Sequence, residues 1–598
     1  MNAFRYGLIS ALQAIVVFVA IACCASTVRA DEAPSFSERV DLEPLGTIAV
    51  YGEGRLKSLG SHANSMMQFV TGPRKIAGQD SLFTYIDLML RPEAYVDADL
   101  VYVKNRSVRE AIARELERLA AADPTLAPDM AERMNAFRAT GLTSPRFLHN
   151  AALEPLFSKL EADVIRTARP VSEIRSALAV AEPGFLLGKL MIVPPASKST
   201  DDQWHSVGEL MLVPGATTPP AALTRLVPSN GGMDPTAGIP GIDSALQGQI
   251  ADAWRAFVNA WLAQDADGVR TASASLATLL PKVAEGSDLY PEQSRLAWES
   301  WYFHMDQLTS IWLVYMLSVV FLLLGLIYRW TWARRLGVGV FVVAFGLQTF
   351  ALLLRWYISD RWPNSNMFEA VTTAAWFGGC AAMAIELFVR RTPMKSLFFL
   401  GSAAASMVAL MTAHFLPVYL NPNISNMMPV LHDVWLYIHT NVIIFSYVLI
   451  FMAAVSAFCY LAWRMVGGTA AYARVGGAGM LVLEPGSKRA RAGEAPSIGE
   501  VLDGVTMVLM ELSFVLLWAG IVMGAIWADH SWGRPWGWDP KEVFALNTFV
   551  VFALLVHVRL KVVDKGLWTA ILALGGAAVM LFNWIVINFV ITGLHSYA

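Results

Sequence analysis

The sequence predicts an all-α polytopic membrane protein, with about eight transmembrane helices behind a mostly helical N-terminal domain. Composition gives the first reason: of 598 residues, 55% are hydrophobic and only 16% are charged, which is rare among soluble globular proteins. The second reason is distribution, because apolar runs long enough to cross a bilayer begin only after about residue 306. The net charge of −3, without any block of Lys or Arg, gives no indication of nucleic-acid binding.

Residues 1–30 have the features of a secretory signal peptide. A basic residue precedes an apolar run, and Val28 and Ala30 satisfy the small-residue rule for cleavage. The alternative is an uncleaved N-terminal anchor, and either one would export the region that follows. We therefore expect an exported domain over residues 31–303 and a membrane domain over residues 304–598.

The exported domain has mostly helical patterns. Apolar periodicity favours helices near residues 172–182, 244–265 and 292–304. Ser107 and Glu110 have the spacing of a capping box, which predicts the start of another helix.

Residue types that often carry catalysis are scattered in this domain. His62, His149 and His205 are isolated, so we expect each to be an ordinary surface or core histidine. The chain has four cysteines: Cys23, Cys24, Cys380 and Cys459. None of them falls in the exported domain, which excludes a disulfide framework or a Cys-x-x-Cys redox site there. We find no catalytic constellation in this part of the sequence.

Eight apolar segments follow, and each is long enough to cross a hydrocarbon core of about 30 Å. We place them at residues 308–328, 336–354, 369–389, 396–415, 436–462, 506–528, 542–560 and 567–593. The loops between them alternate in charge. Counted from an exterior start, the inner loops hold 14 Lys and Arg residues and the outer loops hold four. The positive-inside rule therefore places residues 31–303, the loop of residues 527–542 and the C-terminus on one exterior face.

The loop of residues 527–542, WADHSWGRPWGWDPKE, ends in a pattern that predicts a helix start. Asp539 suits an N-cap, Pro540 suits the first helical position, and Glu542 is placed to complete a capping box. This interpretation explains the end of the loop as the beginning of the seventh span.

The tryptophans before that helix start need a further explanation. Tryptophan is enriched at membrane interfaces in general, but Trp532, Trp536 and Trp538 alternate here with Gly533 and Gly537. Indole faces, and glycines that permit a close backbone approach, suit a flat apolar ring with acidic arms. Haem fits this description, and the helix N-terminus beside the loop would favour its propionates.

Haem iron needs axial ligands, and the histidines supply candidates. His439 lies near the outer end of the fifth span and His595 follows the eighth, so both are predicted on the face of the tryptophan loop. A lone histidine near a helix end is usually structural, but two on this face favour ligation. His557 lies near the inner end of the seventh span, where an ionisable side chain is a functional candidate. The alternative is an interfacial histidine beside Arg559.

The segment RWPNSNMFEA, residues 361–370, precedes the third span. Asn364, Asn366 and Glu369 are polar groups at a membrane entrance. They either begin the helix, with Glu369 in its first turn, or line a site, and the sequence leaves both interpretations open.

Five separated motifs resemble segments of the CcsA (ResC)-like cytochrome c biogenesis proteins, which belong to the WWD-domain haem-handling family. WGRPWGWDPKE resembles the tryptophan-rich signature, and PNSNMFEA, PVLHDVWLYIH, HVRL and GLHSY are similar to further segments in the family's order. The resemblance covers residues 306–598, and GEGRLKSLGSHA in the exported domain is weakly similar to the N-terminal extension of some members. Arg534-Pro535 and His432-Asp433 depart from the residues that are usual there.

The resemblance implies a set of haem contacts. His439 and His595 would be the two external axial ligands of haem b, and His557 would be a transmembrane ligand for haem on its way out. The external platform would consist of Trp532, Gly533, Trp536, Trp538 and Asp539. In this family a second transmembrane ligand comes from a ResB/CcsB-like membrane protein, which we expect to be a separate chain at the bacterial inner membrane.

The resemblance also implies a reaction, in which haem reaches an outer site and is attached to an apocytochrome c. The apocytochrome would present a reduced Cys-x-x-Cys-His segment, whose thiols add to the haem vinyl groups. The chain would then be part of a cytochrome c synthase (haem lyase) complex, with no residue singled out as catalytic. Two alternatives stay open: a haem exporter or chaperone without ligation activity, and a respiratory membrane subunit that binds b-type haem or quinone.

Overall fold

The computed structural model describes residues 35–72, 75–122, 130–163, 166–196, 202–210, 239, 241–390, 394–426, 433–473 and 497–587. The expected signal peptide, Cys23, Cys24, His432 and His595 lie outside these residues.

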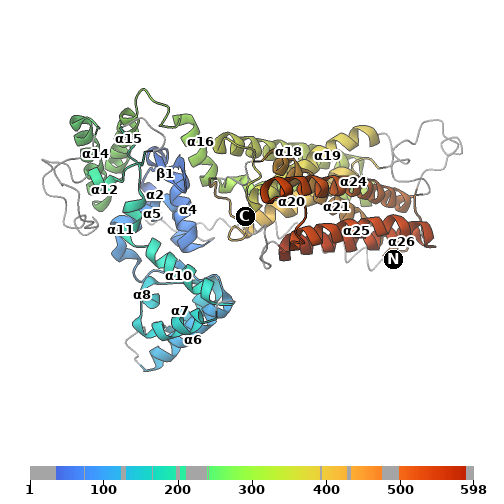
Figure 1. Cartoon of the computed structure of the whole chain (residues 1–598), viewed down its shortest axis with the longest axis horizontal. Coiled ribbons are helices and arrows are strands. Elements are labelled where there is room, and N and C mark those ends of the chain that lie inside the picture. The colour runs from blue at the N-terminus through green and yellow to red at the C-terminus, as the bar shows by residue number, and fades with distance from the viewer. Residues whose placement is uncertain are drawn as a thin grey trace.

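Residues 35–304 form a mostly helical domain with two short two-stranded antiparallel sheets, the β1–β2 hairpin and the pair β3 with β4, which are far apart in the sequence (Figure 1). Its elements are α2 (Phe36–Arg39), α3 (Glu43–Gly46), β1 (Ala49–Gly52), β2 (Arg55–Ser58), α4 (Leu59–Thr71), η1 (Ile76–Gly78), α5 (Ser81–Leu90), η2 (Pro92–Tyr95), β3 (Val101–Tyr102), α6 (Arg106–Ala122), α7 (Met130–Thr140), β4 (Leu142–Thr143), α8 (Pro145–Leu148), η3 (Ala151–Leu153), α9 (Glu154–Glu161), α10 (Ala168–Val180), α11 (Pro183–Lys189), α12 (Val207–Leu210), α14 (Ser244–Leu262), α15 (Ala266–Val283) and α16 (Gln293–His304). The helices expected near residues 172–182, 244–265 and 292–304 are confirmed as α10, α14 and α16.

The predicted capping box at the start of α6 is wrong. The Asn105 side chain accepts from the N–H groups of Ser107 at 3.0 Å and of Val108 at 3.1 Å, so Asn105 is the N-cap. Ser107 therefore lies inside the first turn. Glu110 instead pairs with Arg138 of the neighbouring α7.

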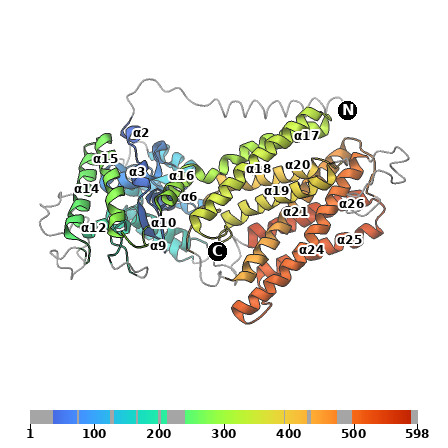
Figure 2. The same ribbon diagram turned by 90° about the horizontal axis from the view of Figure 1, so that it is seen from above.

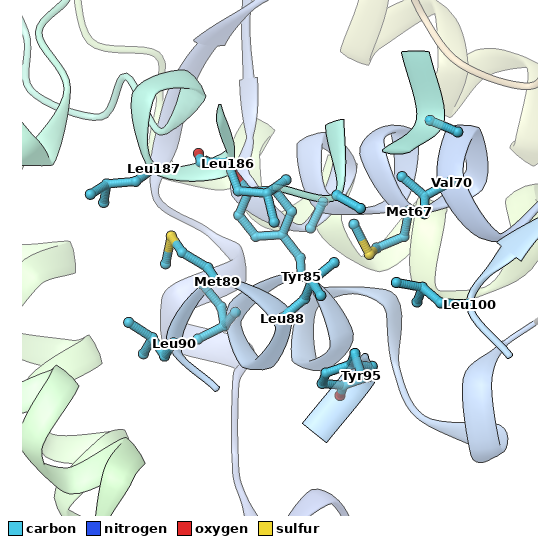
Figure 3. Packing of buried hydrophobic residues seen from close by; sticks show 14 of the residues in the cluster. Met67, Val70, Tyr85, Leu88, Met89, Leu90, Tyr95, Leu100, Leu186 and Leu187 are labelled. Carbon is cyan, nitrogen blue, oxygen red and sulfur yellow. Dashed lines mark hydrogen bonds between the residues drawn. The ribbon is translucent and has the colours of Figure 1, made fainter. Parts of the chain in front are cut away.

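Helix α5 is central to the core of this domain, and nine of its ten residues are buried. Figure 3 shows Tyr85 among Met67, Met89 and Leu186, and its hydroxyl donates to the Leu186 carbonyl at 2.9 Å. The buried Asp87 carboxylate accepts from Tyr95, Trp261 and Arg91. Tyr85 and Asp87, two polar side chains inside this core, are therefore hydrogen-bonded.

His62, His149 and His205 lie in the core or toward the surface of this domain. His62 is buried in the core, and burial lowers the pKa of its imidazole to about 3, so that the ring is neutral. His149 and His205 lie beside Glu182 and Glu209. Among the described residues, no group of three or more His, Cys, Asp or Glu side chains is arranged to hold a metal ion.

Within the described part of the chain, eight helices are long and apolar enough to cross a membrane, which confirms the predicted number. The elements are η4 (Asp306–Ile311), α17 (Trp312–Ile327), α18 (Thr331–Ser359), α19 (Met367–Val389), α20 (Leu397–Phe415), α21 (Val434–Met465), α24 (Ile498–Trp532), α25 (Pro540–Lys561), α26 (Lys565–Phe582) and the π-helical η6 (Asn583–Ile587). Cys380 and Cys459 lie in α19 and α21, inside spans, as expected.

The N-terminal domain contacts the spans at one end of the bundle, which we call the domain end (Figures 1 and 2). The Arg55 Nε group, from the β1–β2 hairpin, donates to the Ile424 carbonyl at 2.7 Å. Arg295 of α16 donates to the Ile358 carbonyl near the end of α18. Tyr302 and the residues around it add an apolar cluster between α16 and α18. The opposite end of the bundle, where α17, α19 and α21 end, is the far end.

Candidate functional site

A cavity of about 620 Å³ opens among α19, α20, α21, α24, α25 and the α26–η6 segment at the domain end of the bundle. This volume lies in the range of small-molecule and cofactor sites. Along α21 the lining runs from Leu436 to Phe451, which corresponds to about 22 Å of helix. The cavity is therefore a deep hollow in the membrane domain, and it contains several of the residues that the sequence singled out.

His439 lies in the wall of this cavity, on the second turn of α21. Asp433 caps that helix through the N–H groups of Trp435 and Leu436, which fixes where the helix begins. The His439 Nδ1 atom lies 2.7 Å from the Gly520 carbonyl oxygen of α24. Because a carbonyl only accepts, Nδ1 carries the proton and Nε2 carries the lone pair of the neutral ring.

Two glycines of α24 create the space for this imidazole. A Cβ atom on Gly524 would lie 2.5 Å from His439 Cε1 and 2.7 Å from Nδ1, closer than any side chain tolerates. A Cβ atom on Gly520 would lie 2.5 Å from the Ile443 side chain, one turn further along α21. The pair therefore lets α21 and α24 approach closely and holds the ring against the α24 backbone.

The tryptophans of the loop take different positions. Trp536 lines the cavity together with Trp527, which is buried in the last turns of α24. Trp532 packs edge-to-face on Trp527 with 4.8 Å between ring centroids. Trp538 contacts Trp536 at 6.0 Å but is 73% exposed and has a positive φ of 55°. Trp536 of the loop and Trp527 of α24 therefore line the cavity, and Trp532 packs against Trp527.

The loop between these tryptophans and α25 is held by the predicted capping box, which is confirmed. Asp539 caps α25 with Pro540 in the first turn, and Glu542 returns to the backbone N–H groups of Asp539 at 3.1 Å and Gly537 at 2.9 Å. Gly533 ends α24 with a positive φ of 69°. The end of α24 and the start of α25 are therefore both fixed, and the loop is short and rigidly anchored.

The segment before α19 begins that helix and also borders the cavity. Asn366 is the N-cap of α19, and Asn364 and Asn366 also line the cavity. Glu369 is fully buried and pairs with Arg355 at 2.8 Å and Arg361 at 3.0 Å. Its carboxylate therefore holds the α18–α19 corner together beside the cavity mouth.

Deeper in the cavity the lining becomes apolar, with one polar pair. The Asn583 side-chain amide donates to the Tyr447 hydroxyl at 2.8 Å, and both residues line the hollow. Asn583 begins the π-helical segment η6, a distortion that is frequent at functional sites. Neither residue was singled out from the sequence, since only the π-helical turn and the packing of α21 on α26 bring them together.

His557 is not among the residues that line this cavity. It is exposed on α25, 12 residues and thus about 18 Å along the helix beyond Ala545, where the cavity lining on α25 ends, and its Nδ1 atom lies 2.8 Å from the Ala553 carbonyl oxygen of its own helix. In the most apolar stretch of α25 only 18% is buried by the rest of the chain, whereas the buried share of the corresponding stretch of α20 is 61%. The structure therefore separates His557 from His439, and His595 lies outside the described residues.

The sequence matches the family described as Cytochrome C assembly protein over residues 364–595. It is 31% identical over 278 residues to the cytochrome c biogenesis protein CcsA of Parasynechococcus marenigrum, covering 44% of this chain and 87% of that protein. CcsA of Gloeobacter violaceus is 30% identical over 300 residues, with 44% of this chain and 86% of that protein covered. Protein NrfI of Wolinella succinogenes is 30% identical over 323 residues, which are 52% of this chain and 32% of NrfI.

Proposed function

Because the chain belongs to the CcsA family of cytochrome c biogenesis proteins, we propose that its cavity receives haem and presents it for covalent attachment to an apocytochrome c. The observation that carries this proposal is the orientation of His439. Its Nδ1 atom donates to the backbone of α24, which is the arrangement that typically orients a metal-ligating imidazole. In this tautomer Nε2 is the nitrogen that would coordinate the iron.

The surroundings of His439 suit a flat apolar ring with acidic arms. Trp527 and Trp536 offer indole surface, while Lys541, Asn364 and Asn366 supply donors for propionates at the mouth. Below them the walls are apolar. Trp532, Gly533, Trp538 and Asp539 are not among the lining residues: Gly533 ends α24, Asp539 caps α25, and Trp532 packs against Trp527.

We propose His595 as the second axial ligand. Ile585 of η6 lines the cavity, and Ile587 is eight residues before His595. A chain of eight residues reaches at most about 28 Å, so the connection to the cavity rim permits this ligation. Two imidazoles would hold haem b while the substrate approaches.

The attachment chemistry requires little from this chain beyond positioning. Each thiol of a reduced Cys-x-x-Cys-His segment adds across one haem vinyl group: sulfur bonds to one vinyl carbon, and a proton is delivered to the other. The two described cysteines, Cys380 and Cys459, lie inside spans, so the thiols come from the apocytochrome. Its histidine then replaces one axial ligand, and the product leaves.

The proposal includes an orientation and a partner. The loops at the far end carry most of the basic residues, which favours the cytoplasm for that end and the periplasm for the domain end. An exposed imidazole in a membrane span is costly, so we propose that a ResB/CcsB-like membrane protein covers His557 on α25 and shares haem ligation with it. The pair would act as a cytochrome c synthase.

The test is the haem content and haem staining of cells that express the chain with its partner. His439→Ala and His595→Ala should abolish covalent c-type cytochromes, leave b-type cytochromes unchanged, and alter the haem spectrum of the purified complex. His414→Ala is the matched control, because this histidine bonds to Thr309 at the domain end and does not line the cavity. Normal c-type cytochromes in both variants would contradict the proposal.

The same experiment separates the two alternatives. A haem exporter without ligation activity would lose haem at the outer face in these variants, yet added haem would restore the cytochromes. A respiratory subunit that binds b-type haem or quinone would lose its own spectrum or quinone activity and leave c-type cytochromes intact. A colourless wild-type complex would exclude a haem-presenting role.

A further inference from the structure

Helix α16, the last helix of the N-terminal domain, is apolar on two faces. Leu296, Tyr302 and Phe303 are buried against the rest of the chain. On the other face Trp298, Trp301 and Met305 are 43%, 37% and 44% exposed; we call these three residues the α16 stripe. A helix in water carries polar residues on its exposed face, so the α16 stripe points to an apolar environment.

The α16 stripe is continuous with the exposed surface of a membrane span. Trp298 and Trp301 each contact Phe350 of α18, with ring centroids 6.2 and 6.4 Å apart. At the other end of the contact, Ser294 bonds to the Tyr357 hydroxyl at 3.3 Å. Helix α16 therefore runs antiparallel to the last turns of α18. Its N-terminal end lies near Tyr357, and its later residues lie beside Phe350, deeper toward the membrane.

The length of α18 gives the depth of this contact. Its 29 residues span about 43 Å, whereas the hydrocarbon core needs only about 30 Å. We place one boundary of the hydrocarbon core at Arg335, near the far end. A core that spans about 20 residues then has its other boundary at Arg355. Phe350 then lies about 8 Å inside that boundary, and the exposed Trp356 and Tyr357 lie just beyond it. The indoles of the α16 stripe are consequently at the height where aromatic belts occur.

We propose that α16 is an interfacial helix whose stripe is covered by the acyl chains and headgroups of the bilayer. Lipid is the occupant because the stripe continues the exposed apolar surface of α18 at the same height, and an indole is suited to this boundary. The lipid contact seats the N-terminal domain on the membrane. It also sets the height at which the β1–β2 hairpin, through Arg55, reaches the loop at Ile424.

The test places a single nitroxide on the full-length protein in phosphatidylcholine nanodiscs, after the native cysteines are replaced. Met305→Cys carries the label on the α16 stripe. Val343→Cys, exposed on α18 within the span, is the reference for lipid. Leu262→Cys is the reference for water, since it is exposed on α14, far from the spans in Figures 1 and 2. Collisions with oxygen report lipid, and collisions with a polar nickel complex report water.

The label at Met305 should collide with oxygen at least about twice as often, relative to nickel, as the label at Leu262, and approach the ratio at Val343. A ratio equal to that of Leu262 would place the stripe in water and overturn the proposal. Protection from both reagents would show that protein, not lipid, covers the stripe, and would overturn it as well. A second label at Ala297→Cys, on the same exposed face, guards against a local effect of the Met305 change.

Discussion

Polar residues have different surroundings at the two ends of the membrane domain. At the domain end, polar side chains surround a hollow: His439 lies in its wall, and Glu369 holds Arg355 and Arg361 beside its mouth. At the far end the charged residues Arg559 and Asp503 also join two helices, but neither of them lines the cavity. Arg559 bonds to both Asp503 oxygens, at 2.8 and 2.7 Å, joining α25 to α24.

The contrast extends to the two histidines that the sequence singled out in the spans. His439 is oriented by the Gly520 carbonyl and by the space at Gly524, so the chain itself fixes the ring. His557 is exposed, and only its own helix supplies a hydrogen-bond acceptor. One histidine is thus prepared by this chain, whereas the other faces outward from α25. If both histidines bind haem, this chain alone positions the ligand at His439, whereas the site at His557 depends on a second chain.

The largest effect is expected from breaking the charged corner at the domain end. Glu369→Gln leaves two arginines without their buried carboxylate, which costs about 3–5 kcal/mol. The transition of the purified protein in thermal or denaturant unfolding should shift down accordingly, whereas Glu292→Gln, a change at an exposed carboxylate, should leave it in place. An unchanged transition would show that this corner does not hold the domain end together.

The matched change at the far end sharpens the comparison. Asp503→Asn should also lower stability, because Arg559 loses its buried partner. It should, however, leave the haem spectrum at the cavity unchanged, whereas Glu369→Gln should alter it. The same spectral change in both variants would mean that the two ends are not independent.

A smaller effect is expected where the N-terminal domain contacts the loop before α21. Arg55→Ala removes the bond to the Ile424 carbonyl and leaves the buried Glu299 with the Ser58 N–H group, a loss of about 2 kcal/mol. Hydrogen exchange over residues 416–426 should accelerate by more than tenfold. Arg39→Ala, at an exposed arginine of the same domain, is the control. Unchanged exchange in Arg55→Ala would show that the loop is held by the membrane domain alone.

The fit of His439 against α24 is tested by a single methyl group. Gly524→Ala places a Cβ atom 2.5 Å from His439 Cε1, so the ring must move, and we expect at least about a tenfold loss of haem affinity, or about 1.4 kcal/mol. Gly575→Ala in α26 is matched to it, since a Cβ atom there meets nothing within 4 Å. Haem titration of the two purified variants makes the measurement. Equal affinities would mean that the ring position does not matter for binding.

Local patterns predicted much of this structure, and packing determined the rest. The eight spans follow from the lengths of apolar runs, and the start of α25 follows from Asp539 and Glu542, because both signals lie within a few residues of one another. The same reasoning from local spacing was wrong at Ser107. Asn105 immediately precedes the helix, and its side chain accepts the hydrogen bonds of the free N–H groups in the first turn. Two good capping residues in competition cannot be ranked by spacing alone.

The cavity required information that no local pattern contains. His439 meets Gly520 across 81 residues, and Tyr447 meets Asn583 across 136. The sequence indicated His439 through its height in the span. The sequence singled out Trp532, Trp536 and Trp538 but not Trp527, whereas Trp527 and Trp536 line the cavity, because which indole faces it depends on how α24 ends and α25 begins.

The smallest effect on the isolated chain is expected at His557, and this makes it the most direct test of the contrast between the two ends. Because the side chain is exposed, His557→Ala should change stability by less than about 0.5 kcal/mol. With the partner present, delivery of haem to the cavity should nevertheless fall, and external imidazole should restore it by replacing the missing ligand. Val550→Ala, also exposed on α25, should do neither. If His557→Ala destabilises the chain by itself, or if imidazole restores nothing, the residue supports the helix rather than the haem.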